Sequence, residues 1–69
     1  MVRFDFALIR RFVAEHAEYD IVVTRPVRHS RRVWRVSVRR PGASCFDREF
    51  RDFVFGADAL TWLYEICGQ

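Results

Sequence analysis

The chain has 69 residues, a length typical of one small domain, so we expect a single unit over residues 1–69. Its eleven aromatic residues (seven Phe, two Trp and two Tyr) and its 51% apolar content exclude an intrinsically disordered chain. The formal net charge is +3, and charged residues interrupt every apolar run well short of the roughly 20 residues that span a bilayer, so we expect a cytoplasmic protein without a membrane segment.

The first element in chain order is a predicted helix from Asp5 to about Ala17. One helix face is formed, at the spacing of an amphipathic helix, by the apolar residues Phe6, Ile9, Phe12 and Val13 together with His16. Asp5 is the expected N-cap, and Phe4 is placed to pack against Ile9 across the first turn. His16 lies near the negative end of the helix dipole, and we interpret it as structural.

Two predicted strands follow. The stretch Tyr19–Arg25 is rich in β-branched residues, and Pro26 ends its pairing because proline lacks an N–H. Residues 26–31 connect it to a second strand, Arg32–Arg40, which Pro41-Gly42 then ends in a turn. This second strand alternates between an apolar set of Trp34, Val36 and Val38 and a polar set of Arg35, Ser37 and Arg39. Alternation sends the two sets to opposite faces of a sheet.

Residues 45–55 fit two patterns. Phe46, Phe50 and Phe53 have helical spacing, with Ser44 before them in a capping position, whereas residues 51–55 alternate as in a strand. We predict a strand over residues 48–55, because Gly56 interrupts a continuous helix.

The last element is a predicted helix from Ala57 to Cys67. Asp58 suits its positive N-terminal end and Gly68 suits its termination. The resulting α-β-β-β-α order predicts an α+β fold, a three-stranded antiparallel meander with both helices packed on one face.

Positive charge is concentrated in the segment that contains the second strand. Residues 21–46 hold seven arginines and no acidic residue, whereas the remainder holds five arginines and nine acidic residues. The candidate binding residues of this arginine-rich hairpin are Arg28, His29, Arg31, Arg32, Arg35 and Arg39. Guanidinium groups at this density require a counter-charge, and phosphates supply one through paired hydrogen bonds. The alternative is a solvated basic face paired in part with Asp47, Glu49 and Asp52 of the third strand.

Three functions are compatible with these features. The first is a non-catalytic module that binds nucleic acid, RNA more than DNA, through the arginine-rich hairpin. The second is a small adaptor or inhibitor, of the kind encoded by phages and mobile elements, that docks on an acidic protein surface of a larger, nucleic-acid-handling complex. Trp62 and Tyr64, at the flank of the last helix's apolar stripe, are candidate interface aromatics, and so small a body with eleven rings is also compatible with a homodimer. The third is a ribonuclease with His29 as general base, although we expect no enzyme.

Metal and cofactor sites lack their usual spacing. The potential ligands His16, His29, Cys45 and Cys67 form no CxxC or HxxxH pair, and the three glycines are scattered, so we expect neither a metal nor a cofactor. Two cysteines are too few for a disulfide framework, and we expect buried thiols, with a bridge between them as the alternative.

The predicted element order resembles that of double-stranded-RNA-binding domains and of the small mRNA-cleaving toxins that share their topology. The RNA-binding family opens its last helix with a lysine cluster, where this chain has Gly56-Ala57-Asp58. The toxins carry a catalytic histidine near a glycine turn, and His29, the candidate here, follows Pro26-Val27-Arg28 without a glycine. The resemblance therefore covers the element order and not the functional residues of either family.

Overall fold

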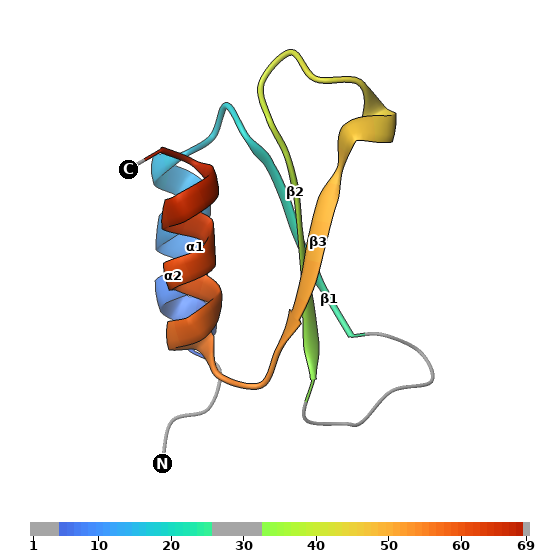
Figure 1. The fold of residues 1–69 in the computed structure, drawn as a ribbon. Coiled ribbons are helices and arrows are strands. Elements are labelled where there is room, and N and C mark those ends of the chain that lie inside the picture. The colour runs from blue at the N-terminus through green and yellow to red at the C-terminus, as the bar shows by residue number, and fades with distance from the viewer. Residues whose placement is uncertain (1–4, 26–32, 69) are drawn as a thin grey trace.

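The computed structural model describes residues 5–25 and 33–68 and shows two layers, with both helices on one side of a sheet (Figure 1). The elements are α1 (Phe6–Glu15), β1 (Asp20–Thr24), β2 (Trp34–Arg39), the short 3-10 helix η1 (Cys45–Asp47), β3 (Glu49–Phe53) and α2 (Gly56–Ile66). The predicted α+β fold and its α-β-β-β-α order are confirmed. Neither helix in the described ranges is long and apolar enough to cross a membrane.

A capping side chain accounts for the start of α1. The Asp5 carboxylate accepts hydrogen bonds from the backbone N–H groups of Ala7, at 2.9 Å, and Leu8, at 3.4 Å, which confirms it as the N-cap of α1. This helix ends at Glu15, two residues before the predicted boundary, because the backbone of His16 (φ −124°, ψ 50°) leaves the helical region. Phe4, the expected partner of Ile9, lies outside the described residues.

Residues 45–55, which fitted both a helix and a strand, contain a short turn of helix followed by a strand. Ser44 caps η1 by accepting a hydrogen bond from the N–H of Phe46 at 3.2 Å, and β3 begins only at Glu49. The capping pattern thus belongs to a single turn of 3-10 helix, and the alternation belongs to the strand after it. All three strands are shorter than predicted, and each includes only residues that pair with a neighbouring strand or directly adjoin such residues.

The sheet is an antiparallel meander in the order β1-β2-β3, so β1 and β3 are its edges. Its register places Val22 of β1 opposite Ser37 of β2, and Ser37 opposite Phe50 of β3. Paired residues of an antiparallel sheet point to the same face. Each row across the three strands therefore lies wholly on the helix side or wholly on the opposite side.

The core lies between the helices and β2. Its buried side chains are Ile9, Phe12, Val36, Val38, Ala59, Trp62, Leu63 and Cys67. The inward orientation predicted for Val36 and Val38 is thus confirmed. Trp34, on the same face, is half-buried and meets the ring of Phe6 edge to face at 4.7 Å. The His16 ring stacks on Phe12 at 4.0 Å, in keeping with a structural role.

The two cysteines differ in environment, and both are free thiols. Cys67 is buried at the end of α2, where the loss of solvent raises the pKa of its thiol. Cys45 is exposed, so the expectation that both thiols are buried was wrong for this residue. It belongs to η1, which projects from the sheet on the side opposite to the helices, where residues 5–25 and 33–68 place no second layer (Figure 1).

Candidate functional site

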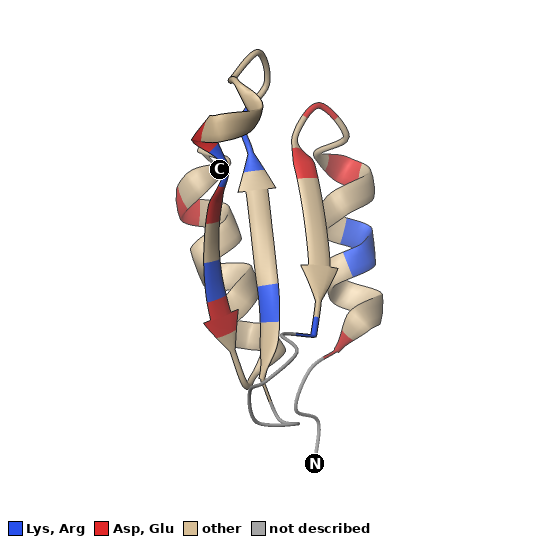
Figure 2. Ribbon diagram, turned by 90° about the vertical axis from the view of Figure 1, so that its right-hand side faces the viewer, with Lys and Arg blue, Asp and Glu red and all other residues tan. Residues whose placement is uncertain are grey.

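The open face, defined as the side of the sheet away from both helices, is the candidate interaction site (Figure 2). Its side chains are Asp20, Val22 and Thr24 from β1, Arg35, Ser37 and Arg39 from β2, Phe50 and Asp52 from β3, and Arg48 just before β3. The polar set of the second strand therefore points away from the core, as its alternation predicted.

Arg35 is held by a carboxylate of the neighbouring strand. Its Nε donates to Oδ1 of Asp52 at 2.9 Å and its Nη2 donates to Oδ2 at 3.3 Å, because the register places the two residues opposite each other. The hydrogen bond to Asp52 is the main cause that raises the pKa of Arg35. The same guanidinium lies over the ring of Phe50, with its Cζ 4.6 Å from the ring centroid. A paired contact to phosphate would have to displace this carboxylate.

At the other end of the open face, two arginines share one carboxylate. Arg39 Nη2 lies 3.6 Å from Asp20 Oδ2, and Arg39 Nη1 also donates to the carbonyl of Ala43 at 3.2 Å. Arg48 extends across the sheet, donating to the Ser37 hydroxyl and to the Asp20 carboxylate. These contacts tie all three strands together and neutralise part of the positive charge.

The structure therefore shows the alternative stated above, in which acidic residues of the same chain pair with the arginines. Arg35 pairs with Asp52, and Arg40 lies 3.3 Å from Glu49, so two of the three suggested acidic residues of the third strand act as counter-charges. Sequence reasoning missed Asp20, which meets Arg39 only through the β1–β2 register. It also missed the reach of Arg48, because no local pattern specifies the direction of a long side chain.

Between the charged ends, the open face is apolar and aromatic. Val22 is 41% exposed and Phe50 is 60% exposed, on either side of Ser37 in the central row. Phe46 of η1, on the same side of the sheet, is 92% exposed (Figure 1). Sequence reasoning placed Phe46 and Phe50 only as helix-or-strand signals. Their exposure follows because no described element forms a second layer over the outer face of β3.

The charge of the described part of the chain differs in sign from that of the whole chain. Residues 5–25 and 33–68 contain eight arginines and nine acidic residues, a net charge of −1 (Figure 2). The four remaining arginines, Arg3, Arg28, Arg31 and Arg32, bring the total to +3 and lie outside these ranges. On the open face itself, three arginines stand against two aspartates, a net charge of +1, so this face is close to charge balance and is not a basic patch.

The candidate residues have different outcomes. Arg28, His29, Arg31 and Arg32 lie outside the described residues, and so does the general base of the ribonuclease hypothesis. Trp62 is 8% exposed and packs against Phe53 with ring centroids 5.6 Å apart, so it is a core residue and not an interface anchor. Tyr64 is 48% exposed and meets Phe12 edge to face at 4.9 Å. Over the described ranges, no three His, Cys, Asp or Glu residues gather as metal ligands.

Neither a protein-family model, nor a curated protein, nor a solved structure matches this chain.

Proposed function

We propose that this protein is a small, non-catalytic adaptor or inhibitor that binds another protein through the open face of its sheet. One observation carries the proposal: the arginines of this face already have carboxylate partners, whereas Phe50 and Phe46 are 60% and 92% exposed. On the open face, exposed rings and not unpaired cations are therefore what is offered to a partner.

Aromatic anchors surrounded by polar groups are typical of protein interfaces. Trp, Tyr and Phe are enriched at the centres of such interfaces, and a few anchors carry most of the binding energy. Here Phe50 and Val22 form the centre, and the pairs of Arg35 with Asp52 and Arg39 with Asp20 form a rim. The matching partner surface has an apolar pocket bordered by groups of both charges, because a strongly acidic surface would meet Asp20 and Asp52.

Nucleic-acid binding is the second candidate, and the charge distribution favours it. Arg28, Arg31 and Arg32 fall within residues 25–33, between β1 and β2, whereas the described ranges have a net charge of −1. Contacts to phosphate would then depend on these three residues and not on the open face, since Arg35 and Arg39 would have to leave their carboxylates.

A pull-down with two matched variants separates the candidates. The immobilised chain is incubated with nuclease-treated lysate as wild type, as Phe46→Ser/Phe50→Ser, and as Arg28→Gln/Arg31→Gln/Arg32→Gln. We expect a protein partner that survives nuclease, is lost with the phenylalanine variant and is kept with the arginine variant. Loss of an anchor ring should weaken the partner's Kd by about 30-fold or more, as for an interface hot spot. Capture that disappears with nuclease, or only with the arginine variant, would instead support nucleic-acid binding.

A further inference from the structure

The helix layer is wider than the sheet that it covers. Two packed helices, each about 10 Å across, with axes about 8–10 Å apart, span roughly 20 Å, whereas three strands spaced about 4.8 Å apart span roughly 15 Å. The difference is about the width of one strand. Figure 2 shows where it falls: α2 lies behind β3, and α1 extends beyond the β1 edge of the sheet.

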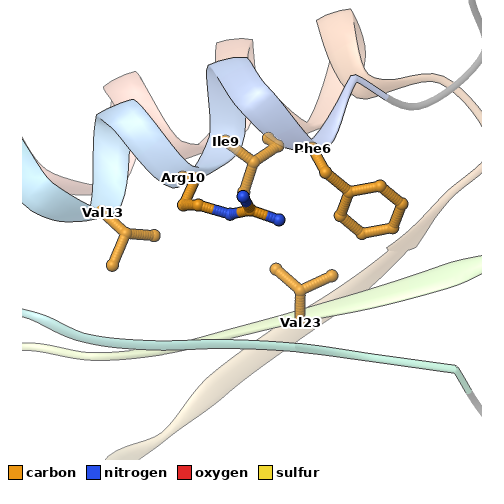
Figure 3. Close-up of a pocket in the computed structure, with 5 residues that line it drawn as sticks. All are labelled: Phe6, Ile9, Arg10, Val13 and Val23. Atoms are coloured by element: carbon orange, nitrogen blue, oxygen red, sulfur yellow. The ribbon is translucent and has the colours of Figure 1, made fainter.

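A groove occupies this overhang. It is lined by Phe6, Ile9, Arg10 and Val13 of α1 and by Val23 of β1, and its hollow measures about 170 Å³ (Figure 3). An apolar cavity of about 150 Å³ holds one benzene ring, so the hollow is large enough for a single apolar side chain. Because Val23 points into the groove from the edge strand, a side chain from a neighbouring strand would enter beside it.

The β1 edge is suited to pairing, and the β3 edge is not. The described chain places no strand beside the outer side of β1, whose Ile21, Val22, Val23 and Thr24 are all β-branched. An open edge of this kind is a template for another strand.

The other edge strand carries charges on its helix side, a feature that discourages strand addition. Arg51 of β3 has its Cζ 5.7 Å from the Trp62 ring centroid, and Glu49 pairs with Arg40 at 3.3 Å. An added strand would therefore pair with β1 rather than with β3.

Arg10, which lines the groove, favours a negatively charged group on any ligand that binds there. Its side chain lies along the groove beside Phe6 and Val23 (Figure 3), and no described residue gives its guanidinium a hydrogen bond or an ion pair. A guanidinium next to an apolar hollow favours a ligand that carries an apolar group and a carboxylate.

We propose that β1 accepts an extended segment of another protein as a fourth strand. The segment places one apolar side chain in the hollow and, two residues away on the same face, an Asp or Glu on Arg10. The spacing follows from the two-residue repeat of a strand, and backbone pairing with β1 supplies the sequence-independent part of the binding. This site is separate from the open face and does not depend on it.

The test uses a displayed library of random octapeptides selected on the immobilised protein, followed by synthetic copies of the enriched peptides. We expect the selected sequences to share an apolar and an acidic residue two positions apart. Arg10→Glu should weaken peptide binding at least tenfold, whereas Arg11→Glu, with the same charge change one residue along the helix, should change it less than twofold. Bound peptide should slow hydrogen exchange of the β1 amides and leave those of β3 unchanged, and N-methylation of the peptide backbone should abolish binding.

Several results would overturn the inference. They are a selection without enrichment, equal sensitivity to Arg10→Glu and Arg11→Glu, or exchange protection that falls on β3. The Phe46→Ser/Phe50→Ser variant keeps the two proposals apart: it should bind the peptides like the wild type, and lost peptide binding would place the site on the open face. Dimers that form without peptide and protect β1 would identify a second copy of the chain as the occupant instead.

Discussion

Three phenylalanines of graded burial provide a quantitative test of the open face. Phe12 is 2% exposed, Phe50 is 60% exposed and Phe46 is 92% exposed. Truncation of a buried Phe to Ala costs about 3–5 kcal/mol, a large part of the roughly 3–10 kcal/mol expected for a domain of this length. Full burial of a Phe side chain contributes about 1.5–3 kcal/mol, so the two-fifths that are covered at Phe50 correspond to about 1 kcal/mol, and Phe46 should contribute almost nothing.

The measurement is thermal unfolding of the three Phe→Ala variants, followed by fluorescence of the two tryptophans and by circular dichroism. Phe46→Ala should leave the midpoint unchanged and Phe50→Ala should lower Tm by roughly 4–8 °C, the shift typical of 1 kcal/mol at this size. Phe12→Ala should be largely unfolded, and Phe12→Leu provides a milder substitution that keeps the site measurable.

Equal losses of stability at all three positions would refute the proposed exposure of the open face. That outcome would mean that Phe46 and Phe50 are packed in solution, either by another part of the chain or by a second copy. Repeating the unfolding at several protein concentrations distinguishes the two, because only a dimer unfolds with a concentration-dependent Tm.

Three further outcomes follow from individual residues. In the native protein a maleimide should modify Cys45 and leave Cys67 unreacted until urea is added, as mass spectrometry can show, since Cys67 is buried and burial raises the pKa of its thiol. Asp5→Ala should lower the free energy of unfolding by about 1 kcal/mol in urea titrations, and Asp5→Asn by less, because only the amide keeps an acceptor for the helix N–H groups. Gly42 has a φ of +76°, and no atom lies within 4 Å of a Cβ added there. Gly42→Ala should therefore lower the free energy of unfolding by about 1 kcal/mol through backbone strain alone, and Gly42→Asn should lower it by less. A Gly42→Ala variant as stable as the wild type would contradict that conformation.

Local periodicity predicted the fold because each face of each element is encoded within a few residues. Val36 and Val38 alternate with Arg35 and Ser37, and this two-residue repeat is sufficient to assign both faces of β2 before any partner strand is known. The N-cap at Asp5 is equally local. The third strand was harder, since the spacing of its phenylalanines fits both a helix and a strand, and pairing with β2 decides between them.

The candidate site could not be predicted to the same degree, because its properties depend on contacts between distant residues. Asp20 and Arg39 are far apart in sequence and meet only through the β1–β2 register. Sequence alone showed a segment without acidic residues, whereas the folded sheet places acidic residues of both neighbouring strands beside its arginines. Trp62 presents the same difficulty. It lies at the flank of the apolar face of α2, and whether such a residue is buried depends on which side chains of the sheet pack against it. Here Phe53 of β3 packs against its ring.

The small size of the domain makes occupancy of the β1 edge energetically important. Among the described residues, eight side chains form the buried core, and one side of α1 overhangs the sheet without a described strand beneath it. A ligand that binds only the folded state adds RT ln(1 + [L]/Kd), which is about 2.7 kcal/mol at a concentration of 100 Kd. For a chain of 69 residues this corresponds to a rise in Tm of roughly 10–20 °C, about twice the effect of the same ligand on a domain of roughly 150–250 residues. Because a fourth strand would cover Val23 and Phe6 as well as add backbone hydrogen bonds, thermal stabilisation by a peptide should disappear in Arg10→Glu and persist in Arg11→Glu.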